Sequence, residues 1–310
     1  MSAPPRPGQL LPTGTRLGSV HVGVTATEPA LAFWTRVLGL TVLDSGDDAI
    51  SLGAGGRELV VVHPGAASPV PQGHTGLYHL AIHLPSRKDL ARAVGRLFAL
   101  RYPNSPTDHL VTETTYLWDP DGNGVELTFE TPERGEFVVL PDGRPVARAR
   151  DGSLRSGRDP VDLESLFGEL AEDDRLDEPL PDGARIGHVH LHVGDLDQTL
   201  GFYRDLIGFR QLTNSPARRM ADTEVDGGVP HTLAMNSWAG VGAPPPPPGT
   251  AGLRHFTIEV PSGTGLQEIA GRLSDQGRTF DEVDGAIEVK DPSSNAFRVV
   301  ERTPSPEEGR

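Results

Sequence analysis

The chain has 310 residues, more than one compact domain usually holds, which predicts two domains or several repeated units. Hydrophobic residues make up 36% and charged residues 23%, as in globular proteins, and no apolar run approaches the roughly 20 residues of a membrane span. A net charge of -15 disfavours nucleic acid and anionic membranes as partners. Because the chain has no cysteine, any metal must be held by His, Asp or Glu. The composition favours a small-molecule partner.

The two ends of the chain are expected to lie outside the folded part. Residues 1–16 contain Pro and Gly where a secretory signal needs a continuous apolar segment, so they predict a flexible N-terminal arm and a cytoplasmic protein. Residues 303–310 are expected to form a C-terminal tail.

A first internal repeat relates the two halves of the chain, because the sequence of residues 17–40 aligns with that of residues 186–209 without a gap. Each copy opens with the apolar and polar alternation of a half-buried strand. Each then continues with apolar residues at helical spacing. A glycine follows each predicted helix, Gly39 in one copy and Gly208 in the other, and is expected to end it.

A second repeat aligns residues 76–85 with residues 252–261, and an amphipathic helix is predicted after each, over 88–98 and 266–273. A hairpin is expected next, and its final turns are again alike, with the sequences DPDGNGVE and DPSSNAFR. The chain is therefore predicted to contain four βαβββ modules. Their ranges are residues 17–65, 76–131, 185–240 and 252–302.

In sequence order these modules form two expected domains. Residues 17–131 hold the first and second modules, and residues 185–302 hold the third and fourth. Residues 132–184 form a connector, in which residues 161–170 predict one short helix.

Four such modules, with the helix sequence FYRDLIGF, the strand sequence GLYH and the turn DPDGNGVE, resemble the vicinal oxygen chelate superfamily. Within it they resemble the bacterial catechol-2,3-dioxygenase-like proteins, from about residue 16 to residue 302. The resemblance implies an α+β fold in which modules pair into two cupped mixed β-sheets with helices outside. It also implies a metal site of two first-strand histidines and one last-strand glutamate, which suits Fe(II), with Mn(II) as the alternative.

The ligand positions of the four modules are not equally filled. The first-strand position holds Ser19, His79, His188 and His255 in chain order, and the last-strand position of the second and fourth modules holds Glu126 and Arg298. Only the second and third modules together complete a triad, formed by His79, His188 and Glu126. We therefore expect these two modules to pair, either within one chain or by domain swapping. The oligomeric state, including a homo-oligomer, stays open.

The resemblance also implies residues for the chemistry. His231, expected on the last strand of the third module, would act as the acid-base catalyst because an imidazole pKa lies near working pH. Tyr116 would hydrogen-bond a substrate oxygen through its hydroxyl. His109 and His190 are expected to contact the substrate. The structural alternatives are an edge-strand histidine for His231 and a core aromatic residue for Tyr116.

These features predict an extradiol ring-cleaving dioxygenase that uses non-haem Fe(II), a small aromatic diol and dioxygen. One alternative is another metalloenzyme of the superfamily, such as a glyoxalase-like isomerase or a thiol transferase. Those enzymes usually complete the site with a second carboxylate, near the position that His231 occupies here. A non-catalytic protein that binds a drug or metabolite is the other alternative.

Overall fold

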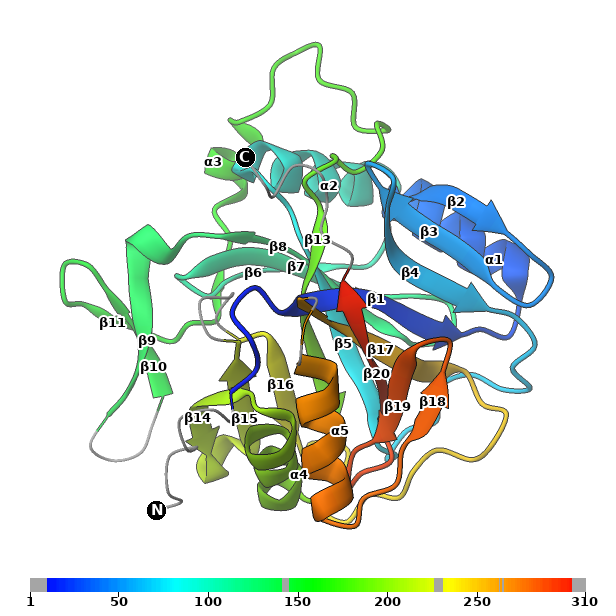
Figure 1. Ribbon diagram of the computed structural model, residues 1–310. Helices are drawn as coiled ribbons and strands as arrows, with labels where there is room; N and C mark the ends of the chain where they lie inside the picture. Colours follow the sequence, from blue (N-terminus) through cyan, green and yellow to red (C-terminus); the bar gives the residue numbers. More distant parts are fainter. Residues whose placement is uncertain (1–9, 141–144, 226–230, 262, 264, 303–310) are drawn as a thin grey trace.

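Two large mixed β-sheets, with helices packed outside them, form the molecule (Figure 1). The structure is a computed structural model, and it describes residues 10–140, 145–225, 231–261, 263 and 265–302. The predicted α+β class with cupped mixed sheets is confirmed. Among the described residues, no helix combines the length and the apolar character that crossing a membrane requires.

Each predicted module is present as a strand, a helix and three further strands. The first comprises β1 (Arg16–Gly23), α1 (Thr27–Leu31), η1 (Ala32–Val37), β2 (Thr41–Ser45), β3 (Ile50–Ala54) and β4 (Arg57–His63). The second comprises β5 (Gly76–His83), α2 (Arg87–Ala99), β6 (Ser105–Asp108), β7 (Thr112–Trp118) and β8 (Gly124–Glu130).

The other two modules repeat this order. The third comprises β13 (Arg185–His192), α4 (Leu196–Phe202), η3 (Tyr203–Ile207), β14 (Arg210–Ser215), η4 (Pro216–Arg218), β15 (Met220–Glu224) and β16 (Leu233–Asn236). The fourth comprises β17 (Gly252–Pro261), α5 (Gly265–Asp275), β18 (Asp281–Val283), β19 (Ala286–Lys290) and β20 (Ala296–Arg302).

The helices begin and end where local chemistry allows. Ser86 caps α2 by accepting a hydrogen bond from the Asp89 N–H. In the first and third modules the helix passes into a π-helical turn, and Gly39 and Gly208 follow with φ of 91° and 104°. Residues with a side chain rarely adopt that left-handed backbone conformation, which explains why a glycine follows each of these two helices.

The sheets combine modules from opposite halves of the chain. One sheet has the order β12-β6-β7-β8-β5-β13-β16-β15-β14 and joins the second and third modules; we call it sheet 2/3. The other has the order β18-β19-β20-β17-β1-β4-β3-β2 and joins the first and fourth; we call it sheet 1/4. The expected pairing of the second and third modules is therefore found, and it occurs within one chain.

The first strands lie at the centre of both sheets and have equivalent registers. In sheet 2/3, β5 and β13 are antiparallel with His79 opposite His190. In sheet 1/4, β17 and β1 are antiparallel with His255 opposite His21. Each pair is interrupted by irregularities at corresponding positions, so ligand positions can be compared between the sheets residue by residue.

The connector has more structure than the one helix that was expected. It contains η2 (Pro132–Arg134), β9 (Gly135–Val139), β10 (Pro145–Ala149), β11 (Leu154–Arg155), β12 (Asp159–Pro160) and α3 (Leu163–Phe167). Strands β9 to β11 form a small antiparallel sheet at the edge of the molecule (Figure 1). Strand β12 pairs with β6 and so extends sheet 2/3. Short strands interrupted by Gly and Pro give little periodic signal, which is why they were not predicted.

The expected terminal segments are only partly described. Residues 1–9 of the expected arm and the whole expected tail, 303–310, lie outside the described residues. At the described end of the arm, Leu11 is 2% exposed and its N–H donates to the Gly208 carbonyl. Leu11 is therefore packed against the third module.

Candidate active site

Strand alternation builds the floor of the cup in sheet 2/3. On β13, His188 and His190 share one face, whereas Val189 and Leu191 point to the other face and join the hydrophobic core. The apolar residues of each first strand thus anchor it, and its histidines face the concave side.

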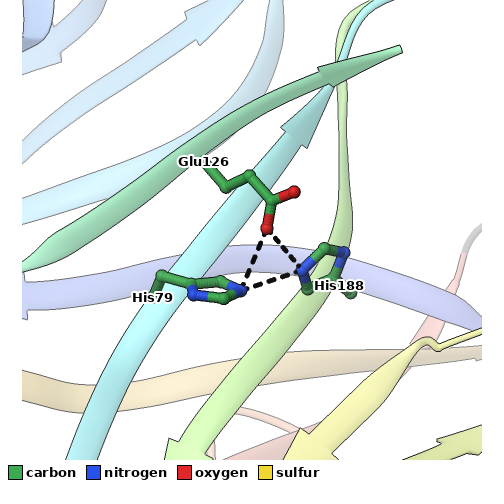
Figure 2. Close-up of side chains that lie close together, drawn as sticks. All are labelled: His79, Glu126 and His188. Carbon is green, nitrogen blue, oxygen red and sulfur yellow. Dashed lines mark hydrogen bonds and ion pairs between the residues drawn. The ribbon is translucent and has the colours of Figure 1, made fainter. Parts of the chain in front are cut away.

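His79 of β5, Glu126 of β8 and His188 of β13 point toward one another (Figure 2). The Nε2 atoms of the two histidines are 3.0 Å apart, and each lies 3.1 Å from Glu126 Oε2. The side chains are buried, with Glu126 only 3% exposed. Within the described part of the chain, this is the one group of three His, Asp or Glu side chains whose ligand atoms converge.

The triangle of donor atoms fits a metal ion. Two ligand atoms that lie about 2.1 Å from one ion, at right angles, are about 3.0 Å apart. Three such atoms on one face, two imidazole and one carboxylate, form the set that binds non-haem Fe(II) in oxygenases. Without an ion, both Nε2 atoms would compete for a single carboxylate oxygen. The residues present therefore fit a divalent metal.

The protonation states also favour a metal. Burial alone would raise the pKa of Glu126, but the two imidazoles outweigh it and hold that pKa well below its usual value. Burial lowers the pKa of His188 to about 3, although Glu126 partly opposes the shift. A carboxylate and a neutral imidazole are the forms that coordinate metals.

A chain of polar contacts orients His188 from behind. Its Nδ1 lies 3.4 Å from His83 Nε2, and His83 Nδ1 lies 2.7 Å from Glu130 Oε1. This contact with the His83 imidazole lowers the pKa of Glu130. Such contacts to the outer nitrogen of a ligating histidine set its tautomer and ring orientation.

His231 lies beside the triad but not on a strand. The prediction that placed it on the last strand of the third module is wrong: it occupies a turn two residues before β16, with φ of 66°. Residues 226–230 of the same predicted segment lie outside the described residues. Its ring centroid is 4.8 Å from that of His188, so it still reaches the cup.

A carboxylate holds the His231 ring. His231 Nδ1 lies 2.9 Å from Asp222 Oδ2, and Asp222 also accepts a hydrogen bond from the Thr213 N–H. Burial alone would lower the pKa of His231, but the hydrogen bond and charge of Asp222 outweigh it and raise the pKa. This arrangement leaves Nε2 as the nitrogen not held by Asp222.

Tyr116 and His109 form a pair at the other side of the cup. The Tyr116 hydroxyl lies 2.8 Å from His109 Nε2, and His109 Nδ1 lies 2.5 Å from the Gly157 carbonyl oxygen. Because a carbonyl only accepts, His109 donates to it from Nδ1, and in the neutral ring Nε2 then accepts the Tyr116 O–H. Burial, followed by the charge of Glu126, raises the pKa of Tyr116 well above its usual value.

His190 lies within the same cluster. Its ring centroid is 5.0 Å from that of His79 and 5.9 Å from that of His231. Asn236 holds it through a 2.9 Å contact between Nδ2 and His190 Nε2. Burial lowers the pKa of His190 well below its usual value, so it is neutral. The ring of Tyr78 packs edge-on against it, at 5.0 Å.

All seven residues singled out in the sequence lie in this one cluster. The supporting residues Asp222, Glu130, Asn236 and Gly157 were not identified from the sequence. They come from neighbouring strands or from the connector, and no motif links them to the histidines they contact. His83 had a weak signal, because strand alternation places it on the same face as His79.

Sheet 1/4 has other side chains at the same register positions. His255 corresponds to His79, Ser19 to His188 and Arg298 to Glu126. The Arg298 guanidinium pairs with Glu288 at 2.7 Å, and His255 Nε2 is buried without a hydrogen-bond partner among the described residues. These residues do not form a metal triad.

Comparison with known proteins identifies the family to which the chain belongs. The model of the Glyoxalase/Bleomycin resistance protein/Dioxygenase superfamily matches residues 16–127 and 185–299. Catechol-2,3-dioxygenase of Bacillus subtilis (strain 168) is 34% identical over 286 residues, covering 91% of this chain and 96% of that protein.

Solved structures show a similar fold. The crystal structure of a putative dioxygenase from Bacillus subtilis subsp. subtilis str. 168 has a TM-score of 0.61 at 14% identity, covering 94% of this chain and 87% of that one. A mutant of glyoxalase I from Zea mays has a TM-score of 0.53 at 15% identity, covering 93% of this chain and 92% of that one. The chain belongs to the glyoxalase/bleomycin resistance protein/dioxygenase superfamily, and it is an oxidoreductase of the dioxygenase type.

Proposed function

We propose that this protein is an extradiol ring-cleaving dioxygenase that acts on a small aromatic diol with dioxygen. The observation that carries the proposal is the buried triangle of His79, His188 and Glu126, with donor atoms 3.0 to 3.1 Å apart. We further propose that this triad holds Fe(II), with Mn(II) as the alternative, since the donor set is typical of non-haem oxygenases. The relationship to catechol-2,3-dioxygenase supports the assignment.

The bound metal would supply a meeting point for diol and dioxygen and a path for electrons between them. In the overall reaction, the ring carbon–carbon bond beside the diol breaks and both oxygen atoms enter the product. One dioxygen is consumed per ring opened, and no external reductant is needed. The diol must lose protons on binding, so the protein must supply acceptors for them.

His231 is the proposed acid-base residue. Asp222 holds its Nδ1 at 2.9 Å and raises its pKa against the effect of burial. His231 Nε2 is then the atom that accepts a proton from a diol hydroxyl and returns one to the product. The carboxylate keeps the ring in one orientation while its charge changes.

Tyr116 and His109 form a second proposed proton route. Tyr116 donates to His109 Nε2, so its oxygen can accept a hydrogen bond from the substrate. A proton leaving the diol would move to the Tyr116 oxygen while the Tyr116 proton moves to His109 Nε2. His190, held neutral by burial, would form part of the wall against the aromatic ring.

The residue near the expected position of a fourth metal ligand favours a dioxygenase over a glyoxalase-like isomerase. Such isomerases usually complete their site with a second carboxylate, whereas this position holds His231. Because the nearby carboxylate, Asp222, lies on Nδ1 of His231, it acts through that histidine.

The test is anaerobic loading with Fe(II), followed by catechol and air. A yellow ring-fission product and uptake of one dioxygen per diol are expected. His79→Ala should lose both bound iron and turnover, whereas the matched variant in sheet 1/4, His255→Ala, should keep both. If the protein bound iron but consumed no dioxygen with any diol, that result would contradict the proposal.

A second variant separates proton transfer from metal binding. His231→Ala should retain iron while turnover falls by roughly 10²-fold or more, because it removes an acid-base group. Unchanged turnover would remove His231 from the mechanism. The unmodified protein loaded with Mn(II) in place of Fe(II) would show which metal supports turnover.

A further inference from the structure

Asn236 lies beside the cup of sheet 2/3 and contacts two histidines of one strand. It is the last residue of β16, pairs with His192 of β13 in parallel register and is 0% exposed. Its Nδ2 lies 2.9 Å from His190 Nε2, and its Oδ1 lies 2.8 Å from His192 Nδ1. The backbone N–H of Trp238 also donates to Oδ1, at 2.9 Å. Both ends of this buried amide are therefore engaged.

The Trp238 N–H decides which way the Asn236 amide points. A backbone N–H only donates, so the side-chain atom that it contacts must be the oxygen. The other end of the amide is then the nitrogen, which also only donates, so His190 Nε2 must be the acceptor. An imidazole nitrogen that accepts a hydrogen bond carries no proton. His190 is therefore neutral, with its proton on Nδ1.

The backbone that orients the amide is itself held in place. The Trp238 indole Nε1 donates to the Arg218 carbonyl oxygen at 2.6 Å, and the Ser237 N–H donates to the Arg219 carbonyl oxygen at 3.0 Å. Turning the Asn236 amide over would bring its NH₂ group against the Trp238 N–H, and two donors repel each other. The tautomer of His190 thus follows from a fixed backbone.

The protonated Nδ1 of His190 is left for a ligand. Within the described residues no hydrogen bond reaches this atom, and it is not one of the fully buried side-chain atoms that lack a partner. The His190 ring lies 5.0 Å from that of His79 and 5.9 Å from that of His231. Its N–H group is therefore a donor beside both a metal ligand and the proposed acid-base residue.

Sheet 1/4 holds the equivalent histidine by the opposite nitrogen. By register, His21 corresponds to His190 and His63 corresponds to Asn236. His63 Nε2 lies 3.0 Å from His21 Nδ1, so the nitrogen that is left available in His190 is occupied in His21. The sheet that contains the triad is thus the one that keeps this Nδ1 for a bound molecule.

We propose that Asn236 is a positioning residue for the reaction: it locks His190 in the neutral form with the proton on Nδ1, so that this N–H donates to an oxygen atom of the reactants. The inference rests on the proposed function and adds a residue to it. Negative charge develops on oxygen as the diol loses protons and dioxygen gains electrons, and a donor already held in place stabilises that charge. His190 donates this hydrogen bond without giving up its proton.

The tautomer can be measured without turnover. In protein with isotopically labelled histidine, loaded with diamagnetic Zn(II), long-range proton–nitrogen correlation spectra show which ring nitrogen carries the proton. His190→Phe identifies the signals of His190. The proton should be on Nδ1 in the unmodified protein, and Nδ1 should lose it in Asn236→Asp, whose carboxylate accepts a proton from Nε2. Asn236→Leu removes the donor without adding a charge and should also release the proton from Nδ1.

Turnover of the Fe(II)-loaded protein tests the consequence. Across these variants kcat should follow the fraction of His190 with a proton on Nδ1, and should fall by about 10²-fold where that proton is lost, with little change in KM. The matched change at the equivalent position of sheet 1/4, His63→Leu, should leave kcat unchanged. A proton on Nε2 in the unmodified protein, retention of the Nδ1 proton in both Asn236 variants, or its loss without a fall in kcat would each overturn the proposal.

A double-mutant cycle separates positioning from a general structural role. His190→Phe keeps a ring in the wall but has no donor, so kcat should fall by a similar factor. Adding Asn236→Leu should lower it little further, because Asn236 acts through His190. Additive losses would overturn the proposal. Absence of oxygen uptake by the unmodified protein with every diol would instead contradict the proposed dioxygenase function, so the two failures are distinguishable.

Discussion

Sheets 2/3 and 1/4 share one architecture but not one chemistry. At equivalent register positions, His79, His188 and Glu126 in sheet 2/3 are replaced by His255, Ser19 and Arg298 in sheet 1/4. The first set brings three donor atoms within 3.1 Å of one another. The second places a guanidinium where the carboxylate would be, and that cation would repel a metal.

The histidines of sheet 1/4 contact one another instead. His21 Nδ1 lies 3.0 Å from His63 Nε2, and the His21 ring stacks on that of His255 at 3.9 Å. Burial, and then His63, lowers the pKa of His21 to about 4, and burial followed by His21 lowers the pKa of His255 to about 3. The comparison teaches that this fold supplies the cup, whereas three side chains decide whether the cup binds a metal.

The largest effect is expected from making sheet 2/3 resemble sheet 1/4. Glu126→Arg replaces an anionic ligand by a cation, so bound iron should fall from about one ion per chain to near zero. Turnover should fall to background with it. Iron analysis and oxygen uptake measure both. The matched change Arg298→Gln in sheet 1/4 should leave them unchanged, and a Glu126→Arg variant that retained iron would contradict the assigned triad.

The converse change should build a second metal site. The combined variant Ser19→His, Arg298→Glu and Glu288→Tyr would give sheet 1/4 the residues found at these positions of sheet 2/3. Glu288→Tyr removes a carboxylate that would otherwise repel the new one. Metal titration should then rise from about one to about two ions per chain. A stoichiometry that stays at one would show that the two cups differ in more than their ligands.

A smaller effect on metal affinity is expected from removing His83, which contacts the outer nitrogen of His188. His83→Ala removes the ring that contacts His188 Nδ1 and should weaken metal affinity by about 10- to 100-fold. Chelator competition measures the change. The corresponding residue of sheet 1/4, Glu259, pairs with Arg16 at 2.6 Å and is not near the triad. Glu259→Gln is therefore the control, and equal affinities in the two variants would contradict the orienting role of His83.

The smallest expected effect concerns a feature that the two sheets share, the buried aspartate in the turn before the last strand of the second and fourth modules. Asp119 and Asp291 each accept hydrogen bonds from their turn and from Asn123 or Asn295, and burial raises the pKa of each to about 6. Because this pKa exceeds the unfolded value, the folded state binds more protons between the two values. The stabilisation is therefore full below about pH 4 and is lost as pH rises through about 6.

Asp119→Asn and Asp291→Asn each remove that titration. Relative to the unmodified protein, the free energy of unfolding of either variant should rise by about 1–3 kcal/mol between pH 4 and pH 7. Denaturant unfolding at several pH values measures it. Similar changes for both would show that the turns have the same structural role in both sheets. A flat difference would contradict the raised pKa values.

Much of this molecule could be predicted from local sequence. The alternation in the first strands, the helical spacing after them and the glycines that end the helices all act over a few residues, so the four modules were identifiable. The identities of Ser19, His188 and Arg298 even indicated that the second and third modules pair. What local sequence missed is the set of contacts between distant segments, such as Asp222 with His231 and Gly157 with His109.

By itself, the sequence determined the modules and the residues at each ligand position, because strand and helix periodicity are properties of short segments. Only the tertiary structure decided that β5 and β13 join within one chain and that the connector reaches the site. The reason is physical: strand pairing and side-chain contact depend on which surfaces meet across long stretches of chain. The contacts of His231 with Asp222 and His188 likewise follow only from how those surfaces meet.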